Sequence, residues 1–137
     1  MSRPKGKPSA ALIDQMLGEA SWLLSHAQAL AGYGREDEAA AEYARAANCE
    51  EQVACLLDAD GQELDGAIHR VSAASCCERV GQFTRAVTLY RAALSVPLRD
   101  SYRADVEGLL ARCLASAQKE LSQAAKRRKR KPASTAP

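Results

Sequence analysis

The sequence is poor in aromatic residues, which make up only 4% of its 137 positions. No segment alternates β-branched with polar residues, the pattern that a half-buried strand requires. No run approaches the ~20 apolar residues that span a bilayer. Much of the 47% apolar content is instead alanine, the best helix former. We therefore expect an all-α protein without strands or membrane spans.

Cysteine and histidine lack the spacing that metal or thiol sites need. No Cys-x2-Cys or His-x3-His pair occurs, and the adjacent Cys76 and Cys77 point about 100° apart on a helix. His26 and His69 have no nucleophile and carboxylate within helical reach, so we expect His26 at the edge of the core and His69 at the surface. A glycine-rich phosphate loop is missing too. We expect no metal, no cofactor and no catalytic residue, and hence no enzyme.

The five cysteines are odd in number and follow no secretory signal pattern. Free thiols are typical of a reducing compartment. We therefore expect a cytoplasmic protein, or a nuclear one if the source is eukaryotic.

Basic residues gather at the two ends of the sequence. Without the nine at 3–7 and 126–131, ten Lys and Arg face seventeen Asp and Glu, a net charge of −7. This acidic central part of the chain repels nucleic acid and anionic membranes. We expect a disordered basic N-terminus at 1–8 and a basic, disordered tail at 126–137. Weak, non-specific contacts with nucleic-acid phosphates or an anionic surface would then come from Lys126, Arg127, Arg128, Lys129, Arg130 and Lys131.

Between the ends, residues 9–125 carry apolar residues every three or four positions, as amphipathic helices do. This period predicts helices at about 10–31, from Glu36 to Leu57, from about 64, from Phe83 and from about 100. Glycine-containing turns at 32–34, 58–61 and 81 separate the first four, and Pro97 ends the fourth. In the fifth helix the apolar pattern ends at Leu121.

A shift of 47 residues aligns two parts of the chain with six identities: Ser25/Ser72, Ala27/Ala74, Gly34/Gly81, Ala39/Ala86, Tyr43/Tyr90 and Ala46/Ala93. Glycine suits a turn between helices, and alanine suits the places where helices touch. The spacing Gly-x4-Ala-x3-Tyr-x2-Ala resembles the second half of a tetratricopeptide repeat. The resemblance covers about residues 10–97. The repeat of 47 residues is longer than that of the family, which is about 34 residues. It implies antiparallel helix hairpins stacked as a short right-handed solenoid of five helices, capped by the fifth.

In that family the first helices of the pairs line a concave face that holds peptides. Matched position by position, the resemblance places on this face Leu24, Gln28, Ile68, Val71, Ser75, Glu78 and Arg79. Some members bind a C-terminal carboxylate there through lysine and asparagine. This chain has Leu24 with Gln28 and Val71 with Ser75 at those positions, which supply no cation, so we do not expect such a clamp.

The resemblance thus implies a non-catalytic interaction scaffold, or adaptor, for a partner peptide or amphipathic helix. Glu78 and Arg79 would set its charge preference. A short solenoid often lacks sufficient core, so homodimerisation through an alanine-rich face is a further expectation. Two alternatives stay open: a small accessory protein that contacts nucleic acid through its basic tails, and a three-helix adaptor. The latter rests on residues 62–122, which resemble the microtubule-interacting-and-transport domain, and leaves residues 10–58 unexplained.

Overall fold

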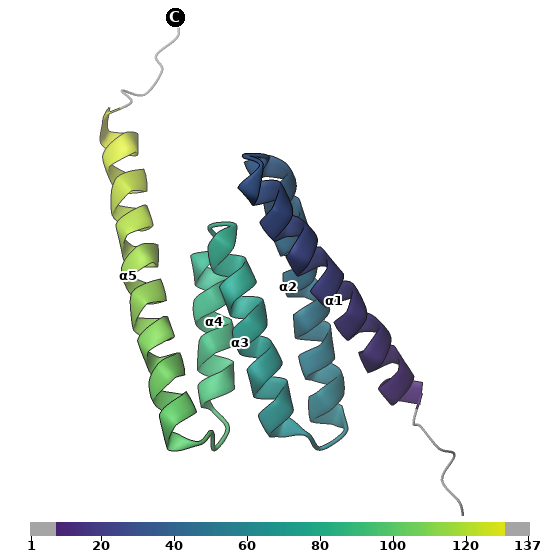
Figure 1. The fold of residues 1–137 in the computed structure, drawn as a ribbon. Coiled ribbons are helices and arrows are strands. Elements are labelled where there is room, and N and C mark those ends of the chain that lie inside the picture. Colours follow the sequence, from purple (N-terminus) through teal and green to yellow (C-terminus); the bar gives the residue numbers. More distant parts are fainter. Residues whose placement is uncertain (1–7, 131–137) are drawn as a thin grey trace, which may run out of the picture.

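The computed structural model describes residues 8–130, which form five helices and the connections between them. These are α1 (Pro8–Gly32), α2 (Glu36–Ala59), α3 (Glu63–Arg79), α4 (Phe83–Leu94) and α5 (Asp100–Arg130). Each helix packs against the next one in the chain, so the five form a row of antiparallel neighbours (Figure 1). No strand occurs in this range, and the all-α prediction is confirmed. None of these helices has both the length and the hydropathy to cross a bilayer.

The first three turns of the chain share one geometry. Gly34, Gly61 and Gly81 have φ values of 77°, 77° and 76°, in the left-handed region that other residues avoid. The N–H of the residue after each glycine donates to the carbonyl five residues earlier, which closes a Schellman motif. These bonds are Arg35 to Leu30 at 2.9 Å, Gln62 to Leu57 at 2.8 Å and Gln82 to Cys77 at 2.9 Å. The turn that the repeat predicts at Gly34 and Gly81 therefore has a third copy at Gly61.

The core is a seam of alanines with two tyrosines. Tyr43 and Tyr90 are 5% and 0% exposed, and the six repeated alanines are at most 1% exposed: Ala27, Ala39, Ala46, Ala74, Ala86 and Ala93. They belong to one cluster that draws buried side chains from all five helices. A smaller cluster of Ile13, Val53 and Leu57 joins the start of α1 to the end of α2. Residues 10–58 are thus part of the same packed body as residues 62–122.

The outer helices extend further than the sequence indicates. α1 begins at Pro8, inside the segment expected to be disordered, and residues 1–7 lie outside the described range. α5 continues past Leu121 to Arg130, so residues 126–130 are helical where a disordered tail is predicted. Lysine and arginine are good helix formers, and cations are stabilised at a helix C-terminus. Lys131 and the residues after it lie outside the described range.

Candidate functional site

One groove lies between α1 and α3, with α2 beneath it, and has a volume of about 270 Å³. We call it the α1–α3 groove. α1 contributes Leu24 and Gln28, α2 contributes the buried Tyr43, and the remaining side chains come from α3: Val71, Ser72, Ser75, Cys76 and Arg79. Five of the residues predicted for the partner site therefore lie together: Leu24, Gln28, Val71, Ser75 and Arg79.

The other two predicted residues, Ile68 and Glu78, do not line this groove. Ile68 is 45% exposed and lines a second depression of about 370 Å³, the α3–α5 pocket, with Leu64, Asp65, Pro97, Leu98, Arg99 and Tyr102. Glu78 accepts a hydrogen bond of 2.5 Å from the Tyr90 hydroxyl, so it ties α3 to α4. Tyr43, Ser72 and Cys76 line the groove but were not predicted. A signal for the two α3 residues exists, because Ser72 and Cys76 each lie three residues before a predicted residue, Ser75 and Arg79. Tyr43 was interpreted only as a core residue.

The two repeated tyrosines differ in how their hydroxyls are satisfied. Tyr90 donates to Glu78 and lies 3.4 Å from Ser75 Oγ. Burial and the Glu78 hydrogen bond raise the pKa of Tyr90. The buried Tyr43 hydroxyl has no hydrogen-bond partner within the described residues. The 47-residue shift explains this difference, because the counterpart of Glu78 is Ala31, which has no acceptor side chain.

Arg79 is the one charged residue among those that line the groove. Its guanidinium carbon lies 5.3 Å from the centroid of the Tyr43 ring, a cation–π distance. Within residues 8–130 it pairs with no carboxylate, whereas three other arginines do: Arg35 with Glu38, Arg70 with Asp58 and Arg85 with Glu51. The guanidinium is therefore held at the groove with its N–H donors free.

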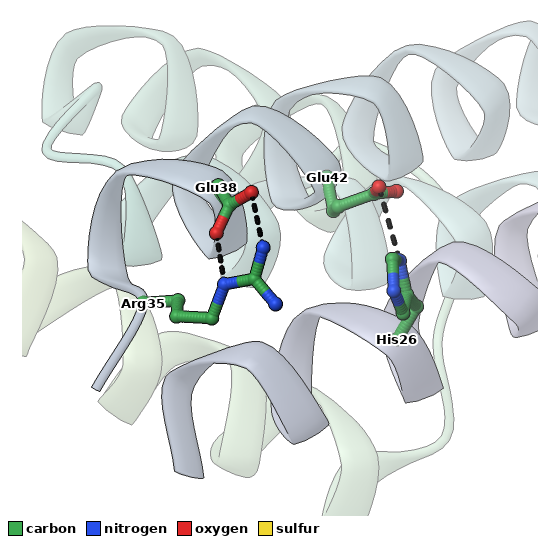
Figure 2. Close-up of polar contacts among 4 residues, drawn as sticks. All are labelled: His26, Arg35, Glu38 and Glu42. Atoms are coloured by element: carbon green, nitrogen blue, oxygen red, sulfur yellow. Dashed lines mark hydrogen bonds and ion pairs between the residues drawn. The ribbon is translucent and has the colours of Figure 1, made fainter. Parts of the chain in front are cut away.

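Two histidine–glutamate pairs attach the groove-lining helices to α2. His26 Nδ1 of α1 lies 3.1 Å from Glu42 Oε1, close to the Arg35–Glu38 pair (Figure 2). The exposed Trp22 stacks on the His26 ring at 4.8 Å between centroids. His69 Nδ1 of α3 lies 2.6 Å from Glu50 Oε2, and the His69 side chain is only 23% exposed. The expectation that His69 lies at the surface is therefore wrong, because Glu50 draws it against α2.

The cysteines are free, and three of them are buried: Cys76, Cys77 and Cys113. Burial raises the pKa of Cys76 and of Cys113 to about 11. These thiols are therefore protonated at neutral pH and are poor nucleophiles. Within residues 8–130, no three His, Cys, Asp or Glu side chains gather in a way that could hold a metal ion.

The basic residues 126–130 are all exposed at the end of α5. This end extends beyond the α3–α4 turn in Figure 1. It carries no buried residue after Cys113. It is therefore a separate basic surface, distinct from the α1–α3 groove.

Comparison with models of protein families, with curated proteins and with solved structures found no match.

Proposed function

We propose that the protein is a non-catalytic, cytoplasmic adaptor that holds a peptide or helix of a partner protein in the α1–α3 groove. The observation that carries the proposal is the groove itself, which gathers five residues from α1 and α3 that the tetratricopeptide resemblance implies. Hairpins that share one glycine turn, with buried alanine and tyrosine at repeated positions, also support a short tetratricopeptide-like solenoid.

The lining of the groove is suited to side chains of a peptide. Its volume of about 270 Å³ lies near the lower end of the roughly 300–1,000 Å³ that is typical of pockets for drug-sized ligands. Leu24 and Val71 offer apolar contact, which contributes about 25 cal/mol per Å² removed from water. Gln28, Ser72 and Ser75 can fix orientation through hydrogen bonds. Such a surface accepts one or two side chains from a larger partner.

The test is a variant carrying Val71→Lys and Ser75→Lys, which fills the groove with charged side chains. We expect a partner recovered from an extract of the native host with the unaltered chain to be depleted at least about tenfold, since a lost apolar contact and a buried charge each cost more than 1.4 kcal/mol. Quantitative mass spectrometry of affinity-purified material measures the depletion. The matched control is Thr84→Lys with Thr88→Lys, which adds the same charges to the exposed surface of α4. Partner recovery that is equal for the two variants, both shown to be folded by circular dichroism, rules the groove out.

A second candidate function rests on the basic end of α5. Five consecutive exposed cations on one helix are suited to nucleic-acid phosphates, and no aromatic residue stands near them to stack on bases. With Lys131 they could neutralise roughly six phosphates, so we expect binding to duplex DNA with a log–log salt slope of about −5. A chain that ends at residue 125 should lose this binding, and the groove variant should keep it. Fluorescence anisotropy at several salt concentrations measures the slope, and an unchanged affinity of the truncated chain excludes the tail.

A further inference from the structure

The exposed face of α3 links the α1–α3 groove to the α3–α5 pocket. Leu64, Ile68, Ser72, Ser75 and Arg79 follow one another at intervals of three or four residues, so they lie on one side of the helix. Ile68 and Leu64 line the α3–α5 pocket, whereas Ser72, Ser75 and Arg79 line the α1–α3 groove. This face is therefore apolar at the N-terminal end of α3 and polar and cationic at its C-terminal end.

The apolar end is exposed. Leu64 and Ile68 are 52% and 45% exposed, and they share their pocket with Leu98 and Tyr102. Figure 1 shows the start of α3 and the start of α5 at the same end of the row of helices, with the end of α4 between them. Exposed aliphatic side chains grouped in this way can be covered by a partner. The pocket is suited to an aliphatic or aromatic side chain.

The opposite end offers a prepared site for an anion. Arg79 rests over the Tyr43 ring without a carboxylate partner in the described chain, so little ordering is needed when an anion binds. The Tyr43 hydroxyl is buried and has no hydrogen-bond partner within residues 8–130, and Ser75 stands one turn from Arg79 on α3. A guanidinium can bind a carboxylate through two parallel hydrogen bonds. The chemistry at this end is therefore suited to a carboxylate.

We propose that the partner segment is an acidic, extended peptide that lies along α3. An Asp or Glu side chain binds Arg79, and an apolar pair fills the α3–α5 pocket. This proposal rests on the proposed function and specifies its ligand. A side chain is chosen over a chain end because the positions that hold a C-terminal carboxylate in tetratricopeptide proteins are uncharged here.

The length of α3 sets the spacing of the motif. Ile68 and Leu64 precede Arg79 by roughly 16 Å and 22 Å along the axis, at about 1.5 Å per residue. An extended chain advances about 3.3 Å per residue. The carboxylate and the apolar pair should therefore be about five to seven residues apart.

The probe is a set of fluorescein-labelled peptides, acetylated and amidated at their ends, in which one Glu and a Phe-Leu pair are separated by two to ten serines. Fluorescence polarisation with the full chain measures the affinities. We expect the tightest binding when the Glu and the pair are about five to seven positions apart. Replacing Arg79 by Gln should weaken it about tenfold or more, the effect of one lost charge-assisted contact. Ile68→Ser should weaken it as well.

The matched control is Arg91→Gln, which removes an exposed cation from α4. Replacing the peptide's Glu by Gln should also cost about tenfold, and this loss should vanish in the Arg79→Gln protein, because both changes remove the same contact. Equal affinities of the Arg79→Gln and Arg91→Gln proteins overturn the acidic motif, as does binding that requires a free C-terminus.

The two failures can be told apart. If Val71→Lys with Ser75→Lys abolishes peptide binding while Arg79→Gln does not, the α1–α3 groove binds the peptide but Arg79 does not recognise an acidic side chain. If no groove variant changes binding, both proposals fall.

Discussion

Replacing His69 by alanine is expected to lower the free energy of unfolding by about 3 kcal/mol at pH 7. The Glu50 side chain is only 9% exposed, and His69 Nδ1 lies 2.6 Å from its Oε2. Removing His69 leaves the buried Glu50 side chain without this hydrogen bond, and an unsatisfied buried group costs about 1–3 kcal/mol, or more when it is charged. The group left behind is a carboxyl, so the upper end of that range applies. Urea unfolding followed by circular dichroism at 222 nm gives the value.

The second histidine–glutamate pair provides the control. His26 and Glu42 are 42% and 14% exposed at the side chain and lie 3.1 Å apart, so His26→Ala should cost at most about 1 kcal/mol. Replacing both Glu50 and His69 by leucine should recover most of the loss, because apolar substitutes remove the buried charge. Equal losses for the two histidines would show that burial does not decide the strength of these pairs.

The two histidine–glutamate pairs stabilise the fold and also position the helices that line the α1–α3 groove. They fasten α1 and α3, the helices that line it, to α2. The glycine turns fix the path of the chain between the helices, and the pairs fix how α1 and α3 lie on α2. Residues that fix the two groove-lining helices are thus found on α2, and not only among those that line the groove.

Regular features of the fold could be predicted from the sequence because they repeat at short range. The turns follow from glycine, and the buried positions follow from the helical period and from the 47-residue shift. The buried Glu50 could not be predicted in this way, because it interrupts an apolar stripe and its partner lies nineteen residues away on another helix. The last turns of α5 were also missed. Charge repulsion argued for disorder there, whereas the structure follows helix propensity.

The candidate site was predicted only in part, for a related reason. Position matching found the side chains of Leu24, Val71 and Ser75, since each follows from the face of a single helix. It also placed both Glu78 and Arg79 on this face, but adjacent residues of a helix point in different directions, and Glu78 turns to Tyr90 instead. The role of Tyr43 depends on Arg79 reaching across from α3, which no local pattern encodes.

Tyr90→Ala is expected to destabilise the protein by about 3–5 kcal/mol, the range for removing a large aromatic side chain from a core. Tyr90 is 0% exposed and lies in the cluster shared by all five helices. The change leaves a cavity and also removes the partner of Glu78. Tyr33→Ala is the matched control, since Tyr33 is 83% exposed and should change stability by less than about 0.5 kcal/mol. Thermal and urea unfolding measure both.

Phenylalanine substitutions then separate the ring from the hydroxyl. Tyr90→Phe keeps the ring and loses the hydrogen bond to Glu78, which should cost about 1–3 kcal/mol. Tyr43→Phe removes a buried hydroxyl that has no partner in residues 8–130, so stability should be unchanged or slightly higher. Because the two tyrosines hold equivalent places in the repeat, a difference between them must come from Glu78 standing where the first hairpin has Ala31. Equal losses of stability at the two positions would mean that the Tyr43 hydroxyl already has a hydrogen-bond partner. It would then not be available to an anion bound at Arg79.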